Sequence, residues 1–118
     1  MLQGLRTVVY FVEDPQKAKA WYEKLLGIAP YYDTPYYIGF NVGGYELGIH
    51  PLKGNKPGSE TYWGVINADE AYAKLLSEGC TSHTPISDVG DGIRLGVVTD
   101  PFGNELGIIE NPHFKLPV

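Results

Sequence analysis

Cysteine and long apolar runs are both scarce in this sequence. Cys80 is the single cysteine among 118 residues, so no disulfide can form within the chain, and it has neither a CxxC partner nor a paired histidine nearby. We interpret it as structural. No segment approaches the roughly 18 consecutive apolar residues that a membrane helix needs, and no signal-peptide core is present. We therefore expect a cytoplasmic protein without a membrane partner.

Basic residues are also few. Nine Lys and Arg stand against 14 Asp and Glu, which gives a net charge of −5. This balance disfavours nucleic acid as a partner and mildly favours cationic or neutral ligands. Aromatic residues, in contrast, are abundant, with nine Tyr, four Phe and two Trp. Some of them are expected to line a binding site.

The chain contains an internal repeat. Gly44-Tyr45-Glu46-Leu47-Gly48-Ile49 and Gly103-Asn104-Glu105-Leu106-Gly107-Ile108 agree at five of six positions, 59 residues apart. A helical pattern followed by a glycine precedes each copy. Repeats of one supersecondary unit usually pack around a shared feature. We expect function to lie there.

The first half, residues 1–51, is predicted to have the element order βαβββ. Strands are predicted at 6–12, 29–34, 36–42 and 45–51, and a helix is predicted to begin after Asp14 and to end at Gly27. The apolar stripe of this helix is predicted to contain Ala18, Trp21, Tyr22, Leu25 and Leu26. Residues 52–60 are predicted to be a linker without secondary structure.

The second half, residues 61–110, repeats the order within the same single domain. A strand is predicted at 61–66, a helix capped by Asn67 and ended by Gly79, and further strands at 81–85, 93–99 and 105–110. Residues 111–118, with two prolines, are predicted to form an extended tail. The fold class is therefore α+β, built from two βαβββ modules.

These motifs resemble a known family. The helix entry Val12-Glu13-Asp14-Pro15, the run from Trp21 to Gly27 and the closing Asp100-Pro101-Phe102-Gly103-Asn104 are similar to the vicinal-oxygen-chelate superfamily of glyoxalases, bleomycin-resistance proteins and extradiol dioxygenases. The resemblance implies two curved mixed sheets around a cleft that holds a divalent metal or a bound drug. It also implies a homodimer, with the tail crossing to the partner.

The resemblance places the family's metal ligands at Thr7, Gly48, Glu60 and Gly107. Only Glu60 is a plausible donor there, because glycine has no side chain and a transition metal needs at least three protein donors. We therefore expect no bound metal and no other cofactor. The two glycines are expected to open space in the cleft, so that leucine at either position would weaken ligand binding and leave the fold intact.

Strand alternation offers a displaced set of donors. Glu46, Gly48 and His50 share one predicted face, Glu60 and Tyr62 another, and Glu105 lies on a third. Glu46, His50, Glu60 and Glu105 would then form a carboxylate and imidazole set that could hold a metal. The alternative is that these residues only satisfy local charges.

For Arg94 and for a group of aromatic residues, the sequence allows two interpretations. Arg94 either reaches the cleft, where it could bind a ligand carboxylate, or lies outside in solvent. A dense aromatic group either walls a pocket or covers a sheet edge or dimer interface; it comprises Tyr31, Tyr32, Tyr36, Tyr37 and Phe40. His83 and His113 are interpreted as surface or interface residues.

The sequence thus favours a small-molecule-binding protein of this superfamily without the usual metal, and it identifies no catalytic residue. The ligand-binding residues are predicted to be Thr7, Glu46, Gly48, His50, Glu60, Tyr62, Arg94 and Gly107. A planar, partly cationic ligand suits carboxylates beside aromatic rings. The alternative is a metal-dependent lyase of the glyoxalase type or a dioxygenase that uses the displaced ligands.

Overall fold

The computed structural model describes residues 1–54 and 57–115. The chain divides into two compact units. Unit 1 comprises Met1–Arg6 and Thr61–Phe114, and unit 2 comprises Thr7–Glu60 with Lys115. The first six residues thus belong with the second half of the chain, which the repeat did not indicate. None of the helices in the described ranges is long and apolar enough to cross a membrane.

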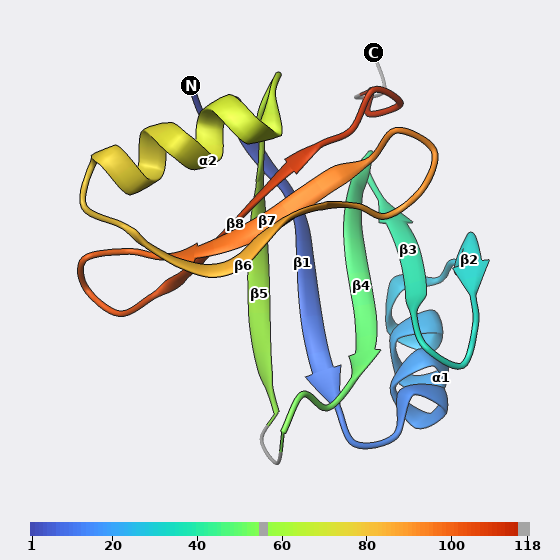
Figure 1. Cartoon of the computed structure of the whole chain (residues 1–118). Coiled ribbons are helices and arrows are strands. Elements are labelled where there is room, and N and C mark those ends of the chain that lie inside the picture. The colour runs from blue at the N-terminus through green and yellow to red at the C-terminus, as the bar shows by residue number, and fades with distance from the viewer. Residues whose placement is uncertain (55–56, 116–118) are drawn as a thin grey trace. The chain divides into compact units, whose positions relative to one another are not determined.

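Unit 2 contains the first βαβββ module (Figure 1). Its elements are β1 Gly4–Val12, α1 Pro15–Leu26, β2 Tyr32–Asp33, β3 Ile38–Val42 and β4 Tyr45–Pro51, and only the first residues of β1, up to Arg6, belong to unit 1. The strand order is β2-β3-β4-β1, with β1 parallel to β4 and the other neighbours antiparallel. Ile38, Phe40 and Ile49 are fully buried against Ala18, Tyr22 and Leu26 of α1.

Helix α1 begins and ends as its sequence predicts. The Asp14 carboxylate accepts hydrogen bonds from the backbone N–H groups of Gln16 and Lys17, Pro15 takes the first helical position, and Gly27 ends the helix at a φ of 72°. The predicted apolar stripe is wrong at two positions. Trp21 is 60% exposed and Leu25 is 64% exposed, because α1 packs on the sheet through a narrower stripe.

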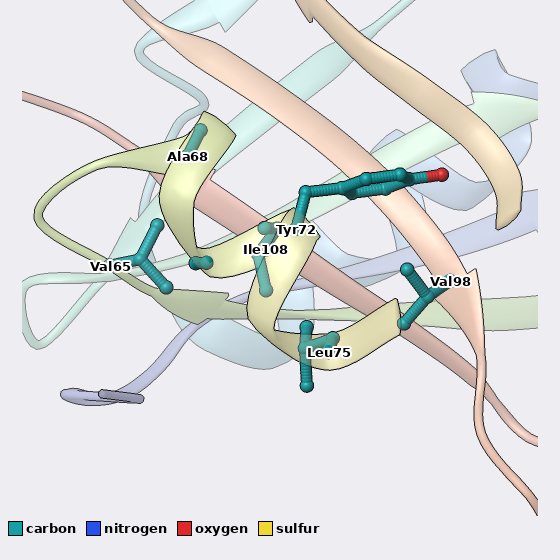
Figure 2. Close-up of a cluster of buried hydrophobic side chains, with 7 residues drawn as sticks. Val65, Ala68, Tyr72, Leu75, Val98 and Ile108 are labelled. Carbon is teal, nitrogen blue, oxygen red and sulfur yellow. The ribbon is translucent and has the colours of Figure 1, made fainter. Parts of the chain in front are cut away.

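Unit 1 contains the second module. Its elements are β5 Gly58–Gly64, α2 Ala68–Ser77, β6 Thr81–Asp88, β7 Arg94–Thr99 and β8 Glu105–Glu110, and only the first residues of β5, up to Glu60, belong to unit 2. The strand order is β5-β8-β7-β6, and β5 is parallel to β8. Figure 2 shows the core of this unit, in which side chains of α2 pack on Val98 of β7 and Ile108 of β8. Cys80 is half-buried against the same cluster.

Helix α2 is fixed at its N-terminus by two side chains. The Asn67 Oδ1 accepts from the Glu70 N–H at 3.0 Å, and the Glu110 carboxylate accepts from the Ala68 N–H at 2.8 Å. Four residues of α2 are buried, whereas none of α1 is. The second helix is therefore the more firmly docked of the two.

The α+β fold of two βαβββ modules is confirmed, and several boundaries are corrected. The predicted linker 52–60 is wrong at its end, because β5 already begins at Gly58; residues 55–56 lie outside the described part of the chain. The strand predicted at 29–34 is reduced to Tyr32–Asp33, and β6 extends to Asp88. In the predicted tail, residues 111–114 form a turn, and residues 116–118 lie outside the described range.

Candidate functional site

One face of the unit 2 sheet carries four of the eight predicted site residues, Thr7, Glu46, Gly48 and His50. Thr7 pairs with Glu46, Phe11 with His50, and Gly39 with Gly48. Paired residues on adjacent strands project to the same side. These side chains therefore share the face opposite α1, because α1 packs against Ile38, Phe40 and Ile49, the residues of alternate phase. We call this the open face of unit 2.

On the open face, the Glu46 carboxylate accepts hydrogen bonds from two tyrosines. Tyr31 Oη donates a hydrogen bond to Glu46 Oε1, and Tyr37 Oη donates to Glu46 Oε2. Hydrogen bonds of the backbone position both tyrosines. Tyr31 N–H donates to the Gly39 carbonyl at 2.9 Å, and Tyr37 N–H donates to Thr34 Oγ1 at 3.0 Å. The predicted site residue Glu46 thus accepts two hydrogen bonds from side chains that the backbone holds in place.

Glycines make room for these tyrosines. A Cβ on Gly48 would lie 2.6 Å from Tyr37 Cζ, and one on Gly39 would lie 3.0 Å from Tyr31 Cε1. The expectation that Gly48 opens empty space is therefore wrong, because the Tyr37 ring fills that space. The absence of a side chain on Gly48 lets the Tyr37 ring lie against the strand and reach Glu46.

Tyr32 joins Tyr31 and Tyr37 in a group that we call the tyrosine cluster. The ring centroids of Tyr31 and Tyr32 are 6.5 Å apart, and those of Tyr32 and Tyr37 are 6.2 Å apart. Tyr31 is 63% exposed and Tyr32 is 50% exposed. Burial raises the pKa of the Tyr31 hydroxyl above its usual value, and its hydrogen bond to Glu46 raises this pKa further. The Tyr31 hydroxyl therefore stays protonated at neutral pH and donates its hydrogen bond to Glu46.

A second group on unit 2 contains the other predicted residues. Glu60 is 4% exposed and forms an ion pair with Lys53, with Oε2 and Nζ 3.6 Å apart. The Lys53 ammonium also lies 5.1 Å from the centre of the Phe11 ring, and Phe11 meets His50 edge to face at 5.4 Å. His50 Nδ1 is 2.7 Å from the carbonyl oxygen of Pro51. Thr7 is buried.

Unit 1 holds the three remaining predicted positions, and it brings Tyr62 and Gly107 together but separates Arg94 from them. Tyr62 covers Gly107, since a Cβ on that glycine would lie 2.6 Å from Tyr62 Cδ1 and 2.9 Å from the Thr61 carbonyl oxygen. Arg94 shares the side of Gly96 and Val98 that faces α2, and both oxygens of Asp69 accept from its Nη2, at 3.0 and 3.1 Å. Arg94 therefore does not share a face with Gly107, and we remove it from the candidate site.

The fold family implies a divalent metal, and the residues present do not fit one. Two of the four family positions, Gly48 and Gly107, have no donor and are covered by tyrosine rings. Among the displaced candidates, Glu46 accepts from two tyrosines and Glu105 Oε1 lies 2.8 Å from His83 Nε2. Within residues 1–54 and 57–115, no three His, Cys, Asp or Glu side chains are grouped so that they could hold a metal ion.

Sequence reasoning missed several residues of these groups. Tyr31 and Tyr37 were seen only as part of an aromatic run, and Lys53 lay in the predicted linker. The signal for Tyr37 is Gly48 itself, because a glycine in a strand interior often marks a close approach of another group. Phe40, from the same aromatic run, is instead fully buried in the core.

The chain belongs to the glyoxalase/bleomycin resistance protein/dioxygenase superfamily, whose family profile matches residues 4–108. This match spans both βαβββ modules. It confirms the resemblance that the helix entry and the closing turn indicated. A search of curated proteins finds no significant match.

Solved structures share the fold at low identity. An NAD-dependent benzaldehyde dehydrogenase from Legionella pneumophila is 22% identical, with a TM-score of 0.70 over 88% of this chain and 96% of its own. A methylmalonyl-CoA epimerase from Streptomyces coelicolor is 13% identical, with a TM-score of 0.75 over 99% and 100%. A Mn(II)-bound glyoxalase from Novosphingobium aromaticivorans is 17% identical, with a TM-score of 0.72 over 92% and 39%. At these identities the likeness establishes the fold alone.

Proposed function

We propose that this chain binds a small, planar, cationic organic molecule at the tyrosine cluster and Glu46, without a resident metal ion. The observation that carries the proposal is the Glu46 carboxylate, which two tyrosine hydroxyls hold on the open face of unit 2. Such a role is binding or sequestration, and we assign no catalytic residue.

The carboxylate keeps capacity for a ligand. An ionised carboxylate has about four acceptor sites, and the two tyrosines use two of them. A ligand ammonium group can therefore bind Glu46 without displacing either tyrosine. The tyrosine hydroxyls also fix the orientation of the carboxylate, which lowers the cost of ordering it when the ligand arrives.

The exposed rings supply the rest of the site. Tyr31 and Tyr32 are half or more exposed although both are large aromatic side chains. A cation over such a ring gains about 0.5–2 kcal/mol, depending on how far it is removed from water. A planar ligand can stack on one ring while its charged group meets Glu46. This combination favours aromatic amines over acids.

The metal-dependent alternative has weaker support. A lyase or dioxygenase of this superfamily type would need at least three donors, and no such group exists among the described residues. We therefore propose that purified protein lacks stoichiometric Ni, Zn, Fe or Mn. Elemental analysis after purification without chelator is the measurement. A stoichiometric metal that survives dialysis and disappears in Glu60→Ala would contradict this proposal.

The ligand proposal is tested with phenethylamine and its uncharged analogue phenethyl alcohol, by calorimetric titration. Glu46→Gln keeps an acceptor for the tyrosines and removes the charge. We expect at least tenfold weaker amine binding in Glu46→Gln and little change for the alcohol. Glu105→Gln is the matched control, because Glu105 holds the same place in the second repeat and pairs with His83. Equal amine binding by parent and Glu46→Gln would overturn the proposal.

A further inference from the structure

A second polar site lies in unit 1, where the first residues of the chain meet the segment after β8. It is a pocket of about 120 Å³, lined by Gln3, Arg6, Gly64, Asn111 and Phe114 together with two aliphatic side chains. All of these residues belong to unit 1. The lining contains one cation and no acidic residue, although the chain as a whole carries a net charge of −5.

The Arg6 guanidinium is held in a fixed position. Its Cζ lies 4.1 Å from the centre of the Phe114 ring. A Cβ on Gly64 would lie 2.7 Å from the same atom, so the guanidinium lies directly against the strand where Gly64 has no side chain. A planar guanidinium stacked on a ring keeps its N–H groups pointing outward at the edges. Arg6 is therefore preorganised to donate hydrogen bonds.

The charge of Arg6 is not neutralised. Its Nη1 donates a hydrogen bond to the backbone carbonyl of Leu5 at 3.3 Å. Within residues 1–54 and 57–115, no carboxylate forms an ion pair with it, whereas Arg94, the other arginine of the chain, binds both oxygens of Asp69. Arginine has five N–H donors. Most of those of Arg6 remain for a ligand.

Asn111 adds a neutral donor beside the guanidinium. Its Oδ1 accepts from the His113 N–H at 2.9 Å, so its acceptor oxygen is engaged within the turn and its Nδ2 amino group remains to donate. The same turn closes with a hydrogen bond from the Phe114 N–H to the Asn111 carbonyl at 3.2 Å, which places Phe114 against Arg6. The turn thus builds two parts of the pocket at once.

We propose that this pocket binds the carboxylate group of a small organic acid. A forked guanidinium matches the two oxygens of a carboxylate, and the neighbouring amide donates to the same group. Val65 and Ile109 supply apolar contact for a short hydrocarbon body. The volume admits only a few non-hydrogen atoms. This site is independent of the proposed function above, because its residues all lie in unit 1 and the tyrosine cluster lies in unit 2.

The test is a titration of the isotope-labelled full chain, followed by amide NMR. The probes are acetate and butyrate, with phosphate and chloride at matched ionic strength as comparisons. We expect saturable shifts of the Gly64, Val65 and Asn111 amides with the two carboxylates. Arg6→Gln should weaken this binding at least tenfold, and Arg6→Lys should weaken it less, since lysine keeps the charge and loses the fork. Lys24→Gln, an exposed cation of α1, should bind as the parent does.

A further variant keeps the test decisive if Arg6→Gln does not fold. Asn111→Asp retains the Oδ1 that accepts from His113 and replaces the amino group by a negatively charged oxygen, so it should also weaken carboxylate binding at least tenfold. Two results would overturn the proposal: unchanged carboxylate affinity in Arg6→Gln or Asn111→Asp, or no saturable shift at the three amides. Shifts with phosphate and none with carboxylates would overturn the assigned ligand class.

Discussion

A glycine lies beneath a tyrosine ring in each half of the chain, at equivalent positions of the internal repeat. Tyr37 covers Gly48 and Tyr62 covers Gly107. The two sites differ in what else is close. The Gly48 neighbours are atoms at the far end of the Tyr37 side chain, which can rotate away, whereas Gly107 also faces the Thr61 carbonyl oxygen at 2.9 Å. Backbone atoms cannot yield as easily.

We predict different costs for alanine at these positions. Gly48→Ala should displace Tyr37 from Glu46, and overpacking of this kind typically costs about 1–3 kcal/mol. Gly107→Ala should be the more destabilising of the two because of the Thr61 carbonyl. Gly58→Ala is the control, since a Cβ there meets nothing within 4 Å. Urea unfolding measures all three. A Gly48→Ala protein that keeps full stability and amine binding would contradict the role given to Tyr37.

The environment of Asp100 should make the stability of the protein depend on pH. Its carboxylate accepts from the Asn104 N–H at 2.8 Å, the Asn104 side chain at 3.0 Å and the Phe102 N–H at 2.9 Å. Hydrogen bonds from Asn104 lower the pKa of Asp100 below its usual value. A lowered pKa in the folded state contributes stability above the unfolded-state pKa of about 3.9, and this contribution is lost as pH falls through the folded-state value.

We therefore expect Asp100→Ala to unfold at a lower temperature than the parent at neutral pH, and the difference to shrink in acid. The measurement is thermal unfolding, followed by circular dichroism, at a series of pH values from neutral down to below the folded-state pKa of Asp100. Phe102→Ala, a change of an exposed residue in the same turn, should show no such pH dependence. A constant difference between Asp100→Ala and parent at every pH would refute the assignment.

The two helices differ in how deeply they are buried. Both are capped by a side chain, Asp14 for α1 and Asn67 for α2, but only α2 has buried residues. Loss of a cap should destabilise the protein most where the helix contributes side chains to the hydrophobic core of its unit. Val65, Leu75, Val98 and Ile108 all belong to the cluster that α2 closes.

We predict that Asn67→Ala destabilises the protein by about 1 kcal/mol, the usual cost of losing such a cap. Asn67→Asp should retain nearly full stability, because its oxygen can still accept from the Glu70 N–H. Chemical unfolding compares the two variants with the parent. If alanine and aspartate lower stability equally, the side-chain oxygen is not what holds the start of α2.

The elements themselves were largely predictable from local sequence. Asp14, Pro15 and Gly27 define α1, and the Gly43-Gly44 hairpin fixes β3 and β4, because these signals act on the residues next to them. The burial of Trp21 was mispredicted, since periodicity shows which residues share a helix face but not how wide the covering sheet is.

The candidate site was less predictable than the fold. Strand alternation correctly grouped Glu46, Gly48 and His50. The tyrosines that cover this face reach it from the segment around β2, across contacts that no local pattern encodes. Arg94 could not be placed either, because a shift of one residue in strand phase moves a side chain to the opposite face. The structure places it beside Asp69.

At the scale of the whole molecule, the exposed surface bears on assembly. Strand β6 pairs with β7 on one side, and it carries Pro85 and register shifts between Ser82 and Thr84 and between Thr84 and Ser87. Proline and bulges discourage pairing with another strand. On α1, in contrast, Trp21 and Leu25 lie one turn apart and are both mostly exposed. Association through α1 is therefore favoured over association through the edge of β6.

We predict that the protein is a homodimer that buries this face of α1. Light scattering should give about twice the chain mass of 13.0 kDa. Trp21→Glu should shift the protein to monomer, because a carboxylate removed from water without a partner is costly. Leu76→Glu, at a partly exposed position of α2, is the matched control and should remain dimeric. A parent protein that is monomeric at micromolar concentration would reject the dimer, and a dimeric Trp21→Glu protein would place the interface elsewhere.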